Sequence, residues 1–285
     1  MHNDHTIQFK KQREIGDIIT DTFKFIRENY KLLFSYILKT TGPFFLVLVL
    51  AVGYYTYSVG GSTLASPLAG GIGNLIVSFT VLILALLLFY SALYGTILHY
   101  IKSYISNDGN VPESEVKTGV QKDFFKLLLL SFLSGILIIA GFIMLVIPGI
   151  FIMVPLSIAR AILVFKDYSV SESISYCFTL VKDHWWITFI TLFVIVILVY
   201  IIGLVFQLPL IIYTVIKTLT AVQEGSLANP EIFKDWIFIT LQVISSVIQY
   251  LLSIITIIAI SFIYFNLNEH KHLTGTYETI EKLGE

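Results

Sequence analysis

Residues 75–98 form a stretch of 24 residues without a single Asp, Glu, Lys or Arg. At a rise of 1.5 Å per residue, this stretch exceeds a bilayer hydrocarbon core of about 30 Å. Five other segments are comparably apolar, namely residues 32–57, 127–147, 149–165, 187–213 and 237–265. Because a water-soluble domain cannot bury six such segments, the sequence predicts an all-α, polytopic membrane protein with six spans.

Composition supports this class and excludes others. Hydrophobic residues make up 56% of the chain and charged residues only 13%. A formal net charge of −1 gives no argument for nucleic acid as a partner. The single cysteine, Cys177, excludes an intrachain disulfide and a cysteine-based metal site, so we predict no metal and no cofactor.

The distribution of Lys and Arg predicts the orientation. Of 18 such residues, 15 lie on one side of the predicted spans, two (Lys217 and Lys234) lie on the other, and Lys39 lies inside the first span. By the positive-inside rule, both termini face the cytoplasm, and we expect a bacterial inner membrane. The domains are then a cytoplasmic segment 1–31, a six-span domain 32–265 and a cytoplasmic tail 266–285.

Two amphipathic helices are predicted on the cytoplasmic face. The first precedes the first span, and its apolar stripe is formed by Ile15, Ile18, Ile19, Phe23 and Ile26. It lies either in the lipid surface or against the protein's own loops, and the sequence leaves both open.

The second amphipathic helix covers residues 169–182, with Val170, Ile174, Phe178 and Val181 on one face. Ser169 and Glu172 have the spacing of a capping box at its start. We expect both amphipathic helices to lie nearly parallel to the bilayer plane.

The dipeptide Pro148-Gly149 separates the third and fourth predicted spans, with no charge nearby. This pattern predicts a tight turn at the far surface that reverses a helical hairpin. A broken, re-entrant segment is the alternative.

Few polar residues fall inside the spans, and these are the candidate site residues. Arg160 and Lys39 are expected to bind lipid or a polar partner, since long cationic side chains reach the headgroups from near a helix end. Gln207, Gln242 and Gln249 could form a polar seam, by hydrogen bonding between helices or along a conduction path.

Ser91, Gly95 and His99 share one helix face at four-residue steps. Two small residues on that face favour close helix packing. A proton relay or a metal ligand is the weaker interpretation of His99, because no carboxylate or second histidine lies in the same span.

Enzyme signatures are missing from the sequence. It contains no H-E-x-x-H, no G-x-S-x-G, no phosphate-binding glycine loop and no paired aspartates within the spans. We therefore predict no catalytic residues, and whether the protein is an enzyme stays uncertain, with a non-enzyme favoured.

The segment IPGIFIMVPLSIARAILVFKDYSVSESISYCFTLVKDHWW, residues 147–186, resembles the membrane domain associated with bacterial glycerophosphoryl diester phosphodiesterases and the related YciC-like membrane proteins. The shared order is a Pro-Gly pair, a short span with an arginine, an S-x-x-E helix and an aromatic start to the next span. In the phosphodiesterases the catalytic site lies in a separate soluble barrel after the membrane part. With only residues 266–285 after the last predicted span, we expect no catalytic residue to carry over.

These observations favour a module that associates with membrane lipids, with other membrane proteins or with itself. The alternative is a transporter or channel for a small or lipidic solute. A polar cavity between the spans near Arg160 and Gln207 would favour that alternative.

Overall fold

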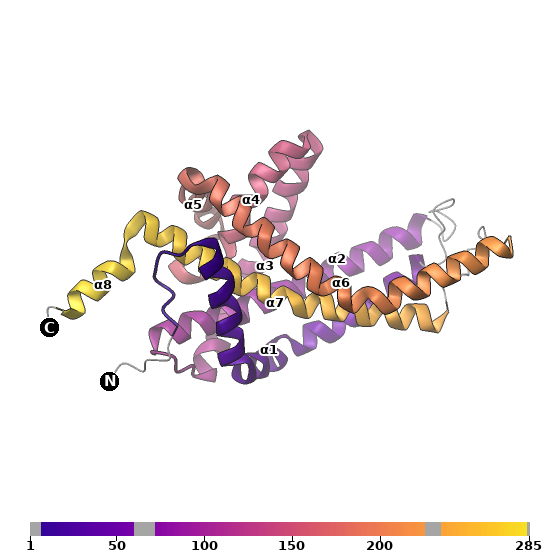
Figure 1. The fold of residues 1–285 in the computed structure, drawn as a ribbon, viewed down its shortest axis with the longest axis horizontal. Helices are drawn as coiled ribbons and strands as arrows, with labels where there is room; N and C mark the ends of the chain where they lie inside the picture. Colours follow the sequence, from indigo (N-terminus) through magenta and orange to yellow (C-terminus); the bar gives the residue numbers. More distant parts are fainter. Residues whose placement is uncertain (1–6, 60–71, 226–234, 284–285) are drawn as a thin grey trace. The chain divides into compact units, whose positions relative to one another are not determined.

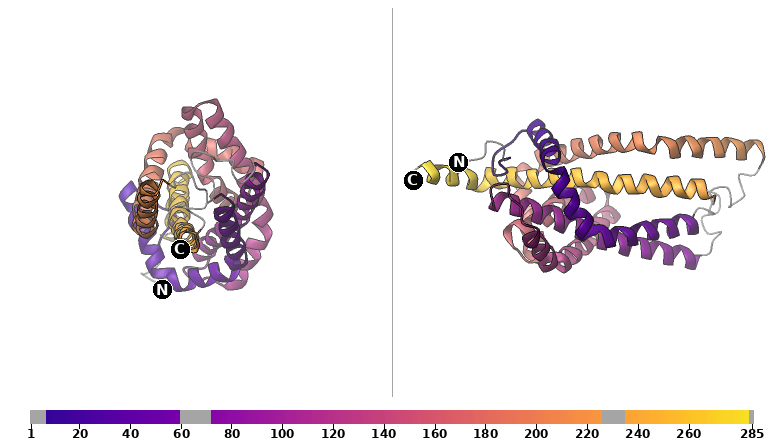
Figure 2. Two further views of the ribbon diagram at one scale, coloured as in Figure 1. Left: turned by 90° about the vertical axis from the view of Figure 1, so that its right-hand side faces the viewer. Right: turned by 90° about the horizontal axis from the view of Figure 1, so that it is seen from below.

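The computed structural model describes residues 7–59, 72–225 and 235–283, and every regular element in this part of the chain is helical (Figure 1, Figure 2). Lys234 and residues 60–71, which lie between the first and second predicted spans, are outside the described part of the chain. The elements are α1 (Ile15–Val59), α2 (Ile72–Ser106), α3 (Glu113–Met144), α4 (Val146–Lys166), α5 (Val170–Val181), the 3₁₀ turn η1 (Lys182–His184), α6 (Trp185–Gln223), α7 (Trp236–His272) and α8 (Thr274–Leu283).

Six helical segments are long and apolar enough to cross a membrane, and each overlaps one of the six predicted spans; the third, α3, ends at Met144, before the predicted end of its span at residue 147. The predicted N-terminal amphipathic segment is not a separate helix, because α1 runs without a break from Ile15 through Pro43 to Val59. Of its apolar stripe, Ile18 is buried within the protein, whereas Phe23 is exposed.

The chain forms two compact units, each of which is described by itself. Unit 1 contains Met1–Thr41, Tyr90–Ile197 and Ile254–Glu285, and unit 2 contains Gly42–Phe89 and Leu198–Ser253. Helices α1, α2, α6 and α7 contribute to both units, whereas α3, α4 and α5 belong wholly to unit 1.

The core of unit 1 is an aromatic cluster that includes the segment before α1. Phe9 stacks on Phe262 with ring centroids 4.4 Å apart and meets Phe25 edge to face at 5.3 Å. Tyr104 joins both rings of this N-terminal part and its hydroxyl accepts a hydrogen bond from the Ile7 N–H at 3.1 Å. Because Phe9 is 2% exposed, the first described residues are part of the core rather than a free tail.

Arg13 holds this N-terminal segment in place. Its guanidinium pairs with Asp21 at 2.8 Å, donates to the Phe9 carbonyl at 2.7 Å and lies 4.8 Å from the centre of the Phe262 ring. Its backbone N–H donates to Asn266 Oδ1 at 2.8 Å. A buried arginine is stable only when its donors are satisfied in this way, so Arg13 locks the segment to α1 and α7.

Helices α3 and α4 lie side by side as an antiparallel hairpin (Figure 1). The prediction of a turn at Pro148-Gly149 is wrong in position, because the only non-helical residue between α3 and α4 is Leu145, with φ −174° and ψ 162°. Pro148 lies in the first turn of α4, where its missing N–H removes no helical hydrogen bond. Gly149 instead permits close approach, since a Cβ there would lie 2.6 Å from the Phe142 ring.

Helix α5 begins with the predicted capping box, which is confirmed: the Ser169 hydroxyl and the Glu172 carboxylate each accept from the other residue's backbone N–H. Phe178 and Val181 of α5 line one small cavity together with Phe151 and Pro155 of α4. Because only three residues join the end of α4 to the start of α5, the two helices run antiparallel along each other.

Unit 2 has a polar cluster where α6 ends and α7 begins. The Tyr213 hydroxyl donates to Asp235 at 2.7 Å, and the Lys217 ammonium lies 3.1 Å from the same carboxylate. Asp235 also accepts from the backbone N–H of Phe238 at 2.9 Å and so caps α7. Burial acts to raise the pKa of Asp235, but these hydrogen bonds and the lysine outweigh it and lower the pKa overall.

Candidate functional site

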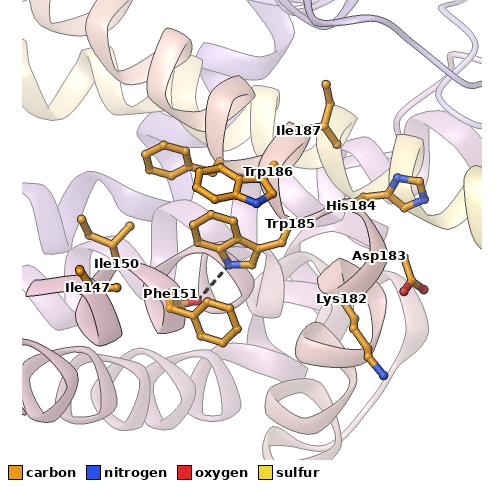
Figure 3. A pocket seen from close by; sticks show the side chains of 10 residues that line it. Ile147, Ile150, Phe151, Lys182, Asp183, His184, Trp185, Trp186 and Ile187 are labelled. Atoms are coloured by element: carbon orange, nitrogen blue, oxygen red, sulfur yellow. Dashed lines mark hydrogen bonds between the residues drawn. The ribbon is translucent and has the colours of Figure 1, made fainter.

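An apolar groove of about 760 Å³ in unit 1 is the candidate site (Figure 3). Its walls come from the start of α4, from η1 and from the start of α6, and its lining residues are Ile147, Ile150, Phe151, Lys182, Asp183, His184, Trp185, Trp186, Ile187 and Phe189. A smaller cavity of about 290 Å³ is also lined by Phe151, Lys182 and Trp185. The groove is therefore apolar along most of its length and polar at one rim.

A proline in α4 explains how the groove is assembled. Pro155 has no N–H, so the carbonyl of Phe151, four residues earlier, has no helical donor. The indole Nε1–H of Trp185 donates to that carbonyl at 3.2 Å, and Figure 3 shows this bond as a dashed line. The proline thus creates an acceptor on α4 that fixes the first residue of α6.

Stacked rings extend this contact along α6. The rings of Phe151 and Trp185 stack with centroids 5.5 Å apart, and Trp185 stacks on Phe189 at 5.4 Å. Phe189 in turn stacks on Phe193 at 5.9 Å. Trp186 meets Trp185 edge to face and also lines the groove, although it is 71% exposed.

The polar rim of the groove is formed by η1, and the last turn of α7 lies beside η1. The rings of His184 and His270 lie 4.9 Å apart, and the Lys271 ammonium donates to the Thr179 carbonyl at 2.9 Å. The Lys182 side chain is exposed, and no carboxylate in the described ranges pairs with it. A cation without a protein partner therefore stands at the polar end of an apolar groove.

The other end of α4 carries a second charged group of residues. Asp167, in the left-handed conformation with φ 53°, pairs with Lys102 at 2.6 Å and with Lys122 at 3.0 Å. The hydrogen bond from Lys102 is the main cause that lowers the pKa of Asp167. Burial opposes it, and the hydrogen bond from Lys122 lowers the pKa further. Both ends of α4 therefore lie beside charged residues of unit 1.

Arg160 lies at the base of the α3–α4 hairpin and faces α2 and α3. Its Nε–H donates to the Ser131 hydroxyl at 3.0 Å, and its guanidinium lies 4.6 Å from the centre of the Tyr94 ring. Ser131 and Tyr94 are both buried. The polar partner of Arg160 is therefore a hydroxyl within the helix bundle.

His99, Gly95 and Ser91 lie on the buried face of α2. A Cβ on Gly95 would lie 3.3 Å from Leu127 of α3, so the two helices pack closely there. His99 Nε2 is 3.1 Å from a carboxylate oxygen of Asp123, which is 1% exposed. Sequence reasoning missed Asp123 because its position on α3, 24 residues away, gives no local signal.

The remaining predicted site residues are not brought together. Lys39 pairs with Glu113 at 2.6 Å in unit 1, and both side chains are more than half exposed. Gln249 lies in unit 2 against Gly203, whose Cβ, if present, would be 2.7 Å from the Gln249 Oε1. In residues 235–283 and the other described ranges, no hydrogen bond joins the side chains of Gln207, Gln242 and Gln249.

Among the residues that the structure describes, no group of three or more His, Cys, Asp and Glu side chains could hold a metal ion. Comparison of the chain with protein-family models, with curated proteins and with solved structures gives no match. Its class is therefore defined by its helices, six of which are long and apolar enough for a multi-pass membrane protein.

Proposed function

We propose that this protein is a non-catalytic module of the bacterial inner membrane that associates with lipid through the groove beside Trp185, with both termini in the cytoplasm. The observation that carries the proposal is the contact between Trp185 and Phe151, which joins an apolar groove to a polar rim. Tryptophan is enriched where hydrocarbon meets headgroups, because its ring is apolar and its N–H is polar. The resemblance of residues 147–186 to the phosphodiesterase membrane domain supports the same proposed function.

The tip of the α3–α4 hairpin supports contact with lipid chains. Residues 143–147 are each at least 62% exposed, and all five are apolar. The turn exposes little unpaired backbone, since the Leu145 N–H donates to Gly141 and the Gly149 N–H donates to Leu145. A surface of this kind is stable in hydrocarbon and unfavourable in water.

The same contact argues against a full crossing by this hairpin. If α4 crossed the bilayer with Lys166 at the cytoplasmic face, Phe151 would lie about 22 Å deeper at 1.5 Å per residue. Trp185 and the adjacent charged residues Lys182 and Asp183 would then lie deep in hydrocarbon, where each charge costs about 2.5–3.5 kcal/mol on insertion scales. A shallow, re-entrant hairpin on the cytoplasmic side avoids this cost.

In this arrangement α1, α2, α6 and α7 cross the membrane. Four crossings keep both termini on one side, so the 15 to 2 distribution of Lys and Arg is preserved. Helix α5 then lies along the cytoplasmic surface beside α4. Self-association or contact with other membrane proteins would use the exposed apolar faces that remain.

The transporter alternative receives less support. The Nε–H of Arg160 already donates to Ser131, and its guanidinium lies over Tyr94. An arginine that has partners inside the bundle anchors the helices, and its charge is not free to bind a solute.

The depth of Trp185 tests the proposal. A variant with Trp186→Phe and Trp236→Phe leaves Trp185 as the single tryptophan, and it is reconstituted with phosphatidylcholine brominated either near the glycerol or near the chain ends. We expect stronger fluorescence quenching by the shallow bromines, as for a matched variant that retains only Trp236. Stronger quenching of Trp185 by the deep bromines would overturn the shallow hairpin, and no quenching by either would overturn lipid contact at the groove.

A further inference from the structure

We infer that the groove is a binding site for one anionic glycerophospholipid of the cytoplasmic leaflet, whose phosphate is bound by Lys182. This assignment rests on the proposed association with lipid and adds the headgroup class. The groove volume of about 760 Å³ is in the usual range for a small-molecule site and admits a glycerol backbone with part of its chains.

The walls fit acyl chains. Ile147 and Ile150 of α4 lie on one side of the groove, and Trp185 and Trp186 lie across it (Figure 3). Phe189 continues the apolar wall along α6. The indole N–H of Trp185 is occupied by the Phe151 carbonyl, so it presents only its ring to a ligand.

The charges at the rim favour an anionic headgroup. Several lysines of unit 1 are neutralised by carboxylates: Lys102 and Lys122 share Asp167, and Lys126 lies beside Asp123. Lys182 is not paired in this way, although it lines both the groove and the smaller cavity.

Two further groups of the rim affect the headgroup. The Lys271 ammonium lies against the carbonyl of Thr179, which lines the smaller cavity, and so adds positive charge nearby. Asp183 is the only carboxylate among the described residues that line the groove, and no ion pair joins it to Lys182. A phosphate diester with no compensating ammonium therefore fits this rim better than a zwitterionic headgroup does.

The test compares headgroups on the full chain with Trp185 as its only tryptophan. Quenching by brominated phosphatidylglycerol is measured against quenching by brominated phosphatidylcholine at equal mole fractions. We expect an association constant about fivefold higher for phosphatidylglycerol, the preference that one lysine near an anionic lipid provides. Lys182→Gln should reduce this ratio to about one, whereas Lys117→Gln, which removes an exposed lysine of the α2–α3 side, should leave it unchanged.

The outcomes separate the two proposals. Equal shallow quenching by both lipids would overturn the headgroup assignment and leave association with lipid intact. A preference that survives Lys182→Gln would overturn the role of Lys182. Loss of the preference on addition of inorganic phosphate would overturn the lipid as ligand, because the site would then recognise a free anion.

Discussion

The α3–α4 hairpin and the α6–α7 pair are both built from long apolar helices, yet their ends differ in chemistry. Where α6 ends and α7 begins, Tyr213, Lys217 and Asp235 form a polar cluster. The α3–α4 hairpin has no charged residue between Lys126 and Arg160, and its turn at Leu145 is flanked by exposed apolar side chains. A polar cluster suits a helix end that reaches water, whereas an apolar turn suits one that stays in hydrocarbon.

The largest expected effect comes from a lysine placed near each of these two helix ends, which tests the comparison directly. In Ile147→Lys the new ammonium would lie among acyl chains, and we expect a reduced folded yield and a loss of stability below the about 2.5–3.5 kcal/mol that a lysine costs at the bilayer centre. Leu219→Lys, near the end of α6, places the same charge on a residue that is also exposed and should cost much less. Equal yields and equal melting temperatures in liposomes would show that the α3–α4 turn reaches an interface.

Two glycines with close neighbours, one in each region, allow the tightness of helix packing to be compared. A Cβ on Gly119 would lie 2.7 Å from Cγ of His99, whose ring is held by Asp123. Because the buried ring cannot move aside, Gly119→Ala should cost about 1–3 kcal/mol. Gly203→Ala meets only the amide end of Gln249, which can rotate, so its melting temperature in detergent should stay close to that of the parent.

Equal destabilisation by the two alanine variants would contradict this prediction. A second variant pair then separates strain at His99 from a general effect of the methyl group. His99→Ala with Gly119→Ala should melt no lower than His99→Ala alone, since the added methyl group then has no ring to meet.

Arg160, at the base of the hairpin, supplies the next effect, of similar size. Arg160→Leu removes the hydrogen bond to Ser131 and the contact with Tyr94, for which we expect a loss of about 1–3 kcal/mol in thermal unfolding. Arg160→Lys keeps the charge but loses the planar fork, so its loss should be smaller. Lys39→Leu, which breaks an exposed ion pair, is the control and should change stability by less than about 1 kcal/mol.

If Arg160→Leu and Arg160→Lys both have the melting temperature of the parent, the guanidinium does not anchor the hairpin. A parallel measurement of co-purified anionic lipid then decides whether Arg160 acts on lipid. If the amount of co-purified anionic lipid is also unchanged, Arg160 does not have the role that its contacts indicate.

Local signals were sufficient for much of the fold. Uncharged stretches of membrane-spanning length predicted all six long apolar helices, and the Ser169–Glu172 spacing predicted the capping box. The turn between α3 and α4 was misplaced because a proline suits the first turn of a helix as well as a loop. In this case Leu145 breaks the helix and Pro148 follows inside α4.

Contacts between distant segments could not be predicted in the same way. Pro155 implies that the Phe151 carbonyl lacks a helical donor, but only the fold brings Trp185 to it, 34 residues away. The burial of Phe9 and Arg13 likewise depends on α7, more than 250 residues later. Cys177 faces the protein interior, so orientation is better tested by cysteines at Lys117 and Glu224 than by labelling the native thiol.

The smallest expected effect concerns Asp167, which ties the end of α4 to Lys102 and Lys122. Because its pKa is lowered in the folded protein, its ion pairs contribute stability above the pKa of the unfolded chain, near 4, and this contribution is lost as the pH falls through the folded pKa. The carboxylate is 49% exposed, so Asp167→Asn should cost less than about 1 kcal/mol at pH 7, and the cost should shrink as the pH falls towards the lowered pKa.

Asp108→Asn is the matched control for Asp167→Asn, since Asp108 has nearly the same left-handed backbone, with φ 49° against 53°. Asparagine tolerates this conformation, so neither substitution adds backbone strain. The melting temperatures of both variants and the parent are measured in detergent between pH 7 and pH 3. Only Asp167→Asn should differ from the parent by an amount that depends on pH. A difference that is the same at pH 7 and at pH 3 would mean that Asp167 acts through its backbone conformation, and the lysines would then hold neither α4 nor the base of its hairpin by charge.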